Sequence, residues 1–327
     1  MAHSAEQLVI YARSHLPDIY VKKIEQLGAL LLIEPWSYGE KEPEIRHDLT
    51  LCNIVLTLGL HDPLAILNAA PNIRWVQSLS VGVDQLLHPK TIERDLVITN
   101  TKGCTAIPIA EHTIAMITSL ARGIPVMLQN QQAKKWEEID VTELAGATVG
   151  IIGYGEIGKE IAKRAKGLEM TVIGCRKRQT ETDEQDPADQ VVSLEDINKV
   201  LEIADFLVLA LPSTKETFHL INGEKLKKMK STSYLINVGR GNTIVEADLL
   251  HALETKQIRG AALDVFEEEP LCSDHPFWSL DNCLISPHTA YYSPKTTERY
   301  MDIFLQNLIR FQKGLPLINV VDKKLGY

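Results

Sequence analysis

The sequence predicts an α/β protein built from two doubly wound parallel-sheet domains. Short apolar runs alternate with segments of helical periodicity, which is the pattern of parallel strands joined by helices. A strand–helix–strand unit with glycines at its first turn spans residues 148–174. An amphipathic segment at 296–314 predicts a helix that packs back on the first domain. The chain would then cross twice between the domains, and we expect a cleft between them.

The first domain is predicted from five short apolar runs. They lie at residues 8–11, 30–33, 54–57, 73–76 and 96–99, and helical patterning at 19–27 and 63–69 separates some of them. Strands and helices that alternate in this way indicate a parallel sheet. Because this half has no glycine fingerprint for a dinucleotide, we interpret it as a substrate (catalytic) domain of residues 1–103 and 291–327.

The second domain is predicted at residues 104–290. A long helical stretch at 108–132 precedes the strand at 148–152, and the next strand is expected at 170–174. Further strands are expected at 206–211, 233–238, 260–265 and 283–286. The dinucleotide-binding domain would therefore occupy the middle of the chain.

Composition and charge narrow the function classes. The 327 residues, 45% apolar and 24% charged, are those of an ordinary soluble protein with room for two cores. A net charge of -9 argues against a general affinity for nucleic acid or anionic membranes. No apolar run approaches the length of a membrane span, so we expect a cytoplasmic protein. Five cysteines without a C-x-x-C pair predict reduced thiols and no metal site.

The run G-Y-G-E-I-G at residues 153–158 follows a strand directly and opens a helix. Gly153 would allow the tight turn, Gly155 the approach of a pyrophosphate, and Gly158 the close packing of helix on strand. The free N–H groups at the helix start favour a bound diphosphate. We therefore predict a dinucleotide site that also includes Glu156 and Ile157, although this interpretation does not explain an acidic side chain beside a pyrophosphate.

The end of the second strand of this unit is basic. Domains that bind NAD normally place a carboxylate there for the 2′-hydroxyl of the adenosine ribose, whereas this chain has Arg176, Lys177 and Arg178. Three cations suit the 2′-phosphate of NADP, because a guanidinium can bind phosphate through two parallel hydrogen bonds. We therefore expect NADP(H) as the favoured cofactor. A solvated basic loop is the alternative interpretation, which leaves NAD(H) possible.

Three polar segments follow apolar strands late in the second domain, and they contain Arg240, Glu269 and His288. In a doubly wound sheet these segments would lie at the carboxyl edge, where ligands bind. Arg240 can bind a substrate carboxylate and polarise a carbonyl, and His288 can supply a proton. A carboxylate at Glu269 would orient the imidazole and favour its protonated form. Taken singly, a surface arginine, an acid in a solvated run and a helix-start histidine are ordinary, but together they favour reduction of a 2-keto acid.

In its motifs the chain resembles the D-isomer-specific 2-hydroxyacid dehydrogenase family, nearly from end to end. Residues 80–84 resemble the substrate loop of that family, residues 100–103 and 110–112 the segment that enters the nucleotide domain, and residues 237–253 the signature around the catalytic arginine. Glu269 before a proline and His288 after a proline match the family's Glu and His.

The resemblance also implies the binding residues and the fold. The first domain would be flavodoxin-like and the second a Rossmann domain. The backbone amides of Val81 and Gly82 would hold the substrate carboxylate, and Arg240 and His288 would also contact the substrate. Asp264 would lie near the nicotinamide carboxamide. The residues at the strand ends that would contact the cofactor are Leu211, Pro212, Val238, Gly239, Asp264, His288 and Ala290.

One departure points to a particular activity within the family. Arg176 stands where NAD-dependent relatives carry Asp, which resembles the NADP-preferring glyoxylate and hydroxypyruvate reductases. The leading hypothesis is therefore NADPH-dependent reduction of a small 2-keto acid to the D-2-hydroxy acid. An NAD-dependent D-2-hydroxyacid or D-3-phosphoglycerate dehydrogenase is the alternative within the class.

A binding protein is the alternative from another class. Residues 287–293 are similar to the C-terminal-binding transcriptional corepressors, which are nucleotide-responsive dimers that keep the same Arg, Glu and His. Family members are usually dimers joined through the nucleotide domain. We therefore expect a homodimer, with the long helix from Ile109 supplying the surface.

Overall fold

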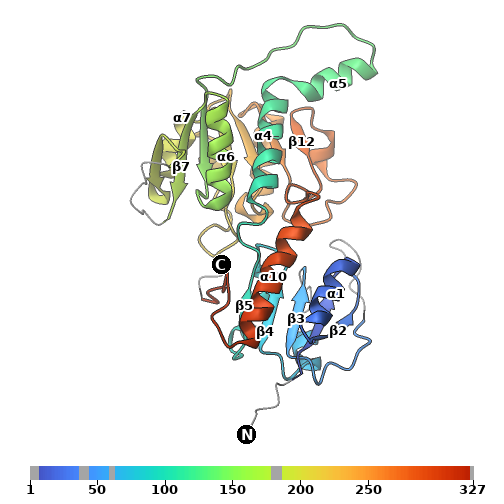
Figure 1. Cartoon of the computed structure of the whole chain (residues 1–327). Helices are drawn as coiled ribbons and strands as arrows, with labels where there is room; N and C mark the ends of the chain where they lie inside the picture. The colour runs from blue at the N-terminus through green and yellow to red at the C-terminus, as the bar shows by residue number, and fades with distance from the viewer. Residues whose placement is uncertain (1–6, 37–43, 59–62, 178–185, 325–327) are drawn as a thin grey trace. The chain divides into compact units, whose positions relative to one another are not determined.

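The computed structural model describes residues 7–36, 44–58, 63–177 and 186–324 (Figure 1). The chain divides into two compact units. The first unit combines Met1–Cys104 with Ser293–Tyr327, and the second unit is Thr105–Tyr292. Each unit contains its own parallel sheet, so the predicted fold class is confirmed.

The described residues of the first unit form a five-stranded sheet in the order β2-β1-β3-β4-β5. All neighbouring strands are parallel, and this is the flavodoxin-like order. The strands are β1 (Val9–Arg13), β2 (Leu30–Ile33), β3 (Ile54–Thr57), β4 (Trp75–Ser78) and β5 (Val97–Thr99). The helices are α1 (Asp18–Gln26), α2 (Pro63–Ala69), α3 (Pro89–Ile92) and α10 (Thr296–Gln312), with a 3-10 turn η1 (Asp84–Leu86).

Both faces of this sheet are buried, because successive strand residues point to opposite sides. In β1, Val9 and Tyr11 pack in a core with α2, whereas Ile10 and Ala12 pack in a core with α1 and α10. Phe304 of α10 is fully buried and stacks on Trp75, with the ring centroids 5.5 Å apart. The last helix therefore completes the core of a sheet whose strands all precede residue 100.

The described residues of the second unit form a seven-stranded sheet in the order β12-β11-β10-β9-β6-β7-β8. Its strand pairs are all parallel. The strands are β6 (Thr148–Ile152), β7 (Thr171–Arg176), β8 (Gln190–Ser193), β9 (Phe206–Leu209), β10 (Tyr234–Asn237), β11 (Gly260–Leu263) and β12 (Cys283–Ile285). The helices are α4 (Ala106–Ala121), α5 (Ile124–Gln132), α6 (Glu156–Gly167), α7 (Ile197–Ile203), α8 (Gly223–Leu226) and α9 (Glu246–Glu254), with 3-10 turns η2 (Leu194–Asp196), η3 (Gly241–Thr243) and η4 (Pro276–Ser279).

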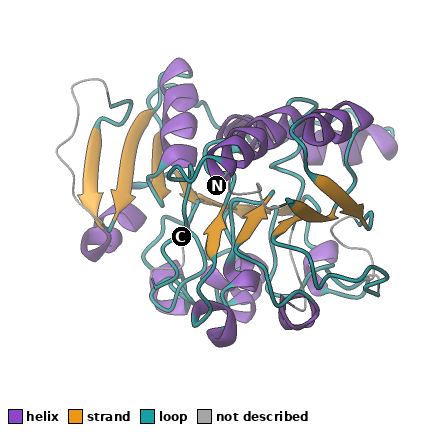
Figure 2. Cartoon of the chain, turned by 60° about the horizontal axis from the view of Figure 1, so that its bottom comes forward, coloured by secondary structure: helices purple, strands orange, loops and turns teal. Residues whose placement is uncertain are grey.

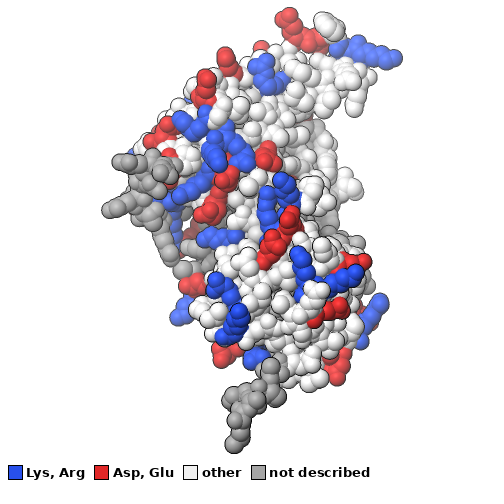
Figure 3. Space-filling view, viewed as in Figure 1, with Lys and Arg blue, Asp and Glu red and all other residues white. Residues whose placement is uncertain are grey.

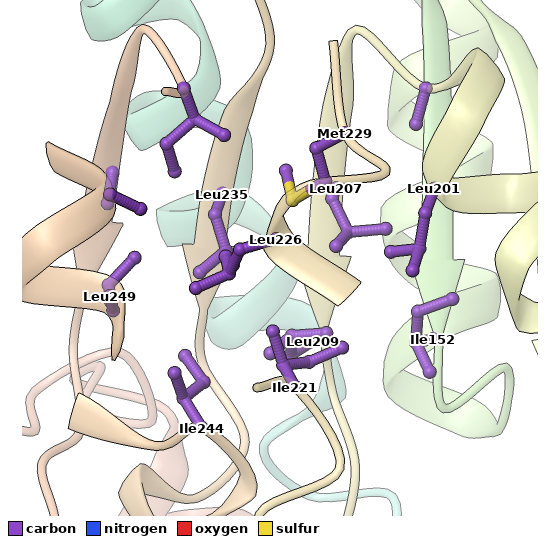
Figure 4. Close-up of a cluster of buried hydrophobic side chains, with 14 of the residues drawn as sticks. Ile152, Leu201, Leu207, Leu209, Ile221, Leu226, Met229, Leu235, Ile244 and Leu249 are labelled. Atoms are coloured by element: carbon purple, nitrogen blue, oxygen red, sulfur yellow. The ribbon is translucent and has the colours of Figure 1, made fainter. Parts of the chain in front are cut away.

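Helices pack on both faces of this second sheet. Figure 2 shows the helices and strands of the chain in separate colours. Phe206 and Val208 of β9 pack with α4 and α6, which lie side by side (Figure 1). Leu207 and Leu209 of the same strand face α7, α8 and α9, and Figure 4 shows both residues in that core. The polar segments of the site follow the carboxyl ends of these strands.

Two sequence predictions of local structure were wrong, and one strand was missed. The helix expected over 108–132 is two helices, because Gly123 adopts φ 65° and ends the α4 segment before α5 begins. The strand expected at 73–76 is β4, two residues later at Trp75–Ser78. The edge strand β8 was not predicted, because its side chains are only half-buried and give no continuous apolar run.

Surface features of the described residues bear on partners. No helix there is long and apolar enough to cross a membrane. On the face in Figure 3, cations and anions are interspersed. All five cysteines carry free thiols, and Cys272 is exposed.

Candidate active site

The fingerprint turn after β6 has the geometry that its glycines were predicted to provide. Gly153 adopts φ +98°, and a Cβ there would lie 2.5 Å from the carbonyl oxygen of Ala210. A Cβ on Gly158 would lie 2.9 Å from the carbonyl oxygen of Gly153, so α6 packs closely on the turn. Gly155 precedes α6 and has no heavy atom within 4 Å of an added Cβ. The tight turn and the close packing are confirmed, whereas contact of Gly155, Glu156 and Ile157 with a pyrophosphate stays a prediction.

Tyr154, between the first two glycines, has a structural role that the sequence did not reveal. Its ring lies over Gly174 of β7, where an added Cβ would meet ring atoms at 2.5 Å. Its hydroxyl donates to Asp186, and burial together with this carboxylate raises the pKa of the phenol. Asp186 also accepts from the N–H of Ala188. The fingerprint turn is thereby linked to the segment that leads into β8.

The basic rim consists of Arg176, the last residue of β7, and Lys177 after it. Arg178 lies outside the described residues. The Lys177 ammonium lies 2.6 Å from a carboxylate oxygen of Glu216, and both side chains are exposed. Glu216 belongs to the loop after β9, so one ion pair joins the loops that follow two strands of the sheet.

That loop after β9 is internally braced. The Thr217 hydroxyl donates to the carbonyl of Pro212 at 2.7 Å and accepts from the N–H of Thr214 at 2.8 Å. The side chain of Asn242 donates to the Ser213 hydroxyl at 3.0 Å. An open hollow is lined by Ser213, Thr214, Lys215 and Phe218. Leu211 and Pro212, predicted to contact the cofactor, thus stand at the start of a fixed loop.

Glu269 and His288 are in direct contact. The imidazole Nδ1 lies 2.6 Å from Oε2 of Glu269, and both side chains are largely buried. The other carboxylate oxygen accepts from the N–H of Phe266 at 2.9 Å. The structure therefore brings together two residues that the sequence separated by a strand, while their catalytic roles stay predictions.

Arg240 follows β10, at the same edge of the sheet. Its carbonyl accepts from the side chains of Asn237 at 3.0 Å and Thr243 at 2.7 Å, and its guanidinium donates to the carbonyl of Gly239 at 2.8 Å. A Cβ on the next residue, Gly241, would lie 1.9 Å from the carbonyl carbon of Phe266. The arginine segment therefore packs against the loop that carries Glu269. Because β10, β11 and β12 are adjacent and parallel, the three predicted catalytic residues share one edge.

Asp264, which follows β11, organises the turn that presents His288. Its side chain is 1% exposed. Its Oδ1 accepts from the Ser286 hydroxyl at 2.5 Å and from the N–H of Thr289 at 3.0 Å, and its Oδ2 accepts from the N–H of Ala290 at 3.1 Å. Its carbonyl accepts from the N–H of His288 at 2.8 Å. The carboxylate therefore holds the whole segment from residue 286 to 290.

The remaining predicted binding residues lie in both units. Val238 and Gly239 follow β10, and Leu211 is close because a Cβ on Gly239 would lie 2.7 Å from its carbonyl oxygen. In the first unit, Val81 and Gly82 lie in the loop after β4, where the side chain of Asn100 donates to the Val81 carbonyl at 2.9 Å. Their role in binding the substrate carboxylate stays a prediction.

A dinucleotide fingerprint and a histidine–carboxylate pair at the carboxyl edge of one parallel sheet are the arrangement expected of a nicotinamide-dependent oxidoreductase. Residues 114–290 match the family model "D-isomer specific 2-hydroxyacid dehydrogenase, NAD binding domain". Glyoxylate reductase of Thermofilum pendens is 35% identical over 325 residues, which are 97% of this chain and 95% of the relative. D-3-phosphoglycerate dehydrogenase of Archaeoglobus fulgidus is 34% identical over 260 residues, which are 79% of this chain and 49% of that relative. The chain therefore belongs to the D-isomer specific 2-hydroxyacid dehydrogenase family.

Solved structures agree with the family assignment. A family protein from Aeromonas salmonicida has 32% identity and a TM-score of 0.82, over 97% of this chain and 99% of its own. An NADPH-dependent glyoxylate/hydroxypyruvate reductase from Sinorhizobium meliloti, in complex with NADP and sulfate, has 25% identity and a TM-score of 0.83, over 98% and 100%. The predicted family and the predicted class, an NAD(P)-dependent 2-hydroxyacid dehydrogenase, are confirmed.

Proposed function

We propose that this enzyme reduces glyoxylate, hydroxypyruvate or a 2-keto acid of similar size to the D-2-hydroxy acid with NADPH. The observation that carries the proposal is the Glu269–His288 contact of 2.6 Å at the sheet edge that also holds Arg240. The similarity to glyoxylate reductase of Thermofilum pendens, over nearly the whole chain, supports the substrate class.

His288 is proposed to give a proton to the substrate carbonyl oxygen. An ionised Glu269 has no hydrogen to donate, so the proton in its bond to the ring belongs to Nδ1. Nε2 is then the nitrogen that can transfer a proton to a ligand. Glu269 fixes the ring orientation and balances the charge of the imidazolium. When bound, the reduced nicotinamide supplies the hydride.

Arg240 is proposed to bind the substrate carboxylate and to polarise the carbonyl. Its carbonyl accepts hydrogen bonds from Asn237 and Thr243, and the next residue, Gly241, packs closely on Phe266. The guanidinium itself donates to the carbonyl of Gly239 at 2.8 Å. The planar, paired N–H groups of a guanidinium suit a planar carboxylate.

NADPH is proposed as the preferred cofactor. The second unit fits a dinucleotide because the space beside Gly155 is open at the start of α6. Cationic Arg176 and Lys177 stand at the end of β7, where an acidic residue would favour NAD. A relative from Xanthobacter autotrophicus with 26% identity and a TM-score of 0.83 was solved with NADPH. We assign the dinucleotide to the second unit and the Val81–Gly82 loop to the substrate.

We also propose a homodimer, which uses α5 rather than α4. Most apolar residues of α4, such as Ile109 and Ile117, are buried within the second unit. Helix α5 buries none of its residues and exposes Val126, Met127 and Leu128. An exposed apolar cluster of this kind marks a surface for association. A cytoplasmic location is part of the proposal, and the free thiols fit a reducing compartment.

Initial rates of the purified enzyme with glyoxylate, hydroxypyruvate and other 2-keto acids test this function, each with NADPH and with NADH. We expect a kcat/KM at least about tenfold higher with NADPH, because one charge-assisted hydrogen bond to a 2′-phosphate contributes roughly 1.5–3 kcal/mol. A clear NADH preference would favour the NAD-dependent D-2-hydroxyacid or D-3-phosphoglycerate dehydrogenase. Cofactor binding without turnover of any 2-keto acid would favour a corepressor-like binding protein.

A further inference from the structure

We propose that His112 is a positioning residue for the reaction, which acts through Ser286 on the carboxylate of Asp264. His112 lies on α4, 174 positions before Ser286 in sequence. Its Nε2 is 3.0 Å from the Ser286 hydroxyl oxygen and 3.7 Å from Oδ1 of Asp264. The inference rests on the proposed function, because it concerns how the nicotinamide site and the turn of His288 are held.

The direction of these hydrogen bonds follows from counting protons. The Ser286 hydroxyl has one hydrogen, and its 2.5 Å contact with the buried Asp264 carboxylate uses it, since an ionised carboxylate can only accept. The hydroxyl oxygen can then only accept from His112. The Nε2 of His112 therefore carries a hydrogen and donates it, which makes the histidine the outer end of a chain of directed hydrogen bonds.

The donors around Asp264 leave room for one more. A carboxylate has about four acceptor positions. Ser286 and Thr289 fill those of Oδ1, and the Ala290 N–H fills one on Oδ2. Among the described residues Oδ2 accepts only this one hydrogen bond, so it is the oxygen proposed to meet the N–H of the nicotinamide carboxamide. Without the hydrogen bond from Ser286, the carboxylate of Asp264 could rotate. Its Oδ2 would then no longer be held in one orientation toward the ligand.

The same carboxylate holds the turn of His288, whose backbone adopts φ 51°. A non-glycine residue in this region persists only when its surroundings fix it. Asp264 supplies those constraints through its carbonyl to His288 and through Oδ1 to Thr289. Helix α4 packs against α6 and the sheet, so His112 stands on a rigid support. Loss of its N–H is therefore expected to disturb both the carboxamide position and the imidazole.

The variants separate the N–H group from the size of the ring. His112→Phe keeps a planar ring and removes the donor, whereas His112→Gln restores an amide N–H at the end of a side chain of similar reach. Ser286→Ala removes the middle of the chain. His251→Phe is the matched control, because His251 lies exposed on α9 in the same unit.

Two readouts are needed, and one is independent of turnover. Steady-state rates give kcat, and titration calorimetry gives the Kd of NADPH and of 2′-phospho-ADP-ribose, which lacks the nicotinamide. For His112→Phe we expect kcat to fall about 3- to 10-fold, as for the loss of one hydrogen bond. The Kd of NADPH should rise by a similar factor while that of 2′-phospho-ADP-ribose stays unchanged. His112→Gln should recover most of both losses, and His112→Phe combined with Ser286→Ala should lose no more than either alone.

Several results would overturn the proposal. The first is a His112→Phe variant with the kcat and Kd of the wild type, and the second is an equal loss in His112→Phe and His112→Gln. The third is an equal rise in the Kd of NADPH and of 2′-phospho-ADP-ribose, which would indicate a general structural effect. If the wild type reduces no 2-keto acid, the proposed function fails, yet the comparison of the two ligands still decides whether His112 acts on the nicotinamide end.

Discussion

At the residue scale, the site depends on a histidine held in an unusual backbone conformation. His288 has φ 51°, a region that costs L-residues roughly 1–3 kcal/mol outside glycine. Its N–H bonds to the carbonyls of Asp264 at 2.8 Å and Ser286 at 3.1 Å hold it there. The backbone conformation of His288 therefore helps to place its imidazole beside the Glu269 carboxylate.

This conformation decides which variant tests the proton donor. Asparagine tolerates positive φ better than alanine, so His288→Asn removes the imidazole with little backbone effect. We expect kcat to fall about 10²- to 10⁴-fold, as for loss of a general acid, while NADPH still binds. Stopped-flow rates and calorimetric titration with NADPH measure the two effects.

A second histidine of the same unit provides the control for His288→Asn. His219 also has φ 51° and also contacts a carboxylate, with Nε2 2.8 Å from Glu267. His219→Asn should therefore show any general effect of this exchange while keeping its turnover. Comparable rates in the two variants would remove His288 from the role of proton donor.

At the scale of elements, the strands could be predicted because most are buried on both faces. β3 and β9 are continuous apolar runs for that reason, and their ends were placed within about two residues. The break between α4 and α5 was not visible, since Gly123 alone does not end a helix unless its backbone becomes left-handed. The strand ends then placed Arg240, Glu269 and His288 at one edge, because parallel strands end together.

Contacts between distant elements could not be predicted. The bond from His112 to Ser286 and the bond from Tyr154 to Asp186 join segments that have no common periodicity. A buried aspartate after a strand is the signal that could have pointed to the bond from His112 to Ser286. A buried carboxylate such as that of Asp264 requires hydrogen-bond donors from neighbouring segments. The bond from Tyr154 to Asp186 leaves no such signal, since a tyrosine in a glycine turn also fits an ordinary apolar role.

The two loops joined by Lys177 and Glu216 provide a prediction on cofactor preference. Arg176→Asp should lower kcat/KM with NADPH about 10- to 100-fold and spare NADH, because it exchanges a cation for an anion at the proposed site of the 2′-phosphate. Glu216→Gln releases Lys177 from its 2.6 Å ion pair, so its kcat/KM with NADPH should rise. The gain should be only about 2- to 5-fold, since exposed pairs are weak.

A surface pair elsewhere in the second unit is the control for that measurement. Glu202 on α7 lies 3.9 Å from the Lys228 ammonium, and Glu202→Gln should leave the ratio of NADPH to NADH rates unchanged. An unaltered ratio in Arg176→Asp would show that the basic rim does not select the cofactor.

At the scale of the whole molecule, α5 presents an apolar surface that the fold of a single chain does not cover. Trp136, just after α5, is fully exposed, and Met127 and Leu128 are 43% and 54% exposed. Because α5 has no buried residue, Met127→Glu with Leu128→Glu should leave folding intact but prevent association. Light scattering after size exclusion should give the wild type twice the 36.5 kDa chain mass and the double variant one chain mass. Ile19→Glu, at a 58% exposed site on α1, should remain a dimer. A double variant with the wild-type mass would mean that α5 is not the interface.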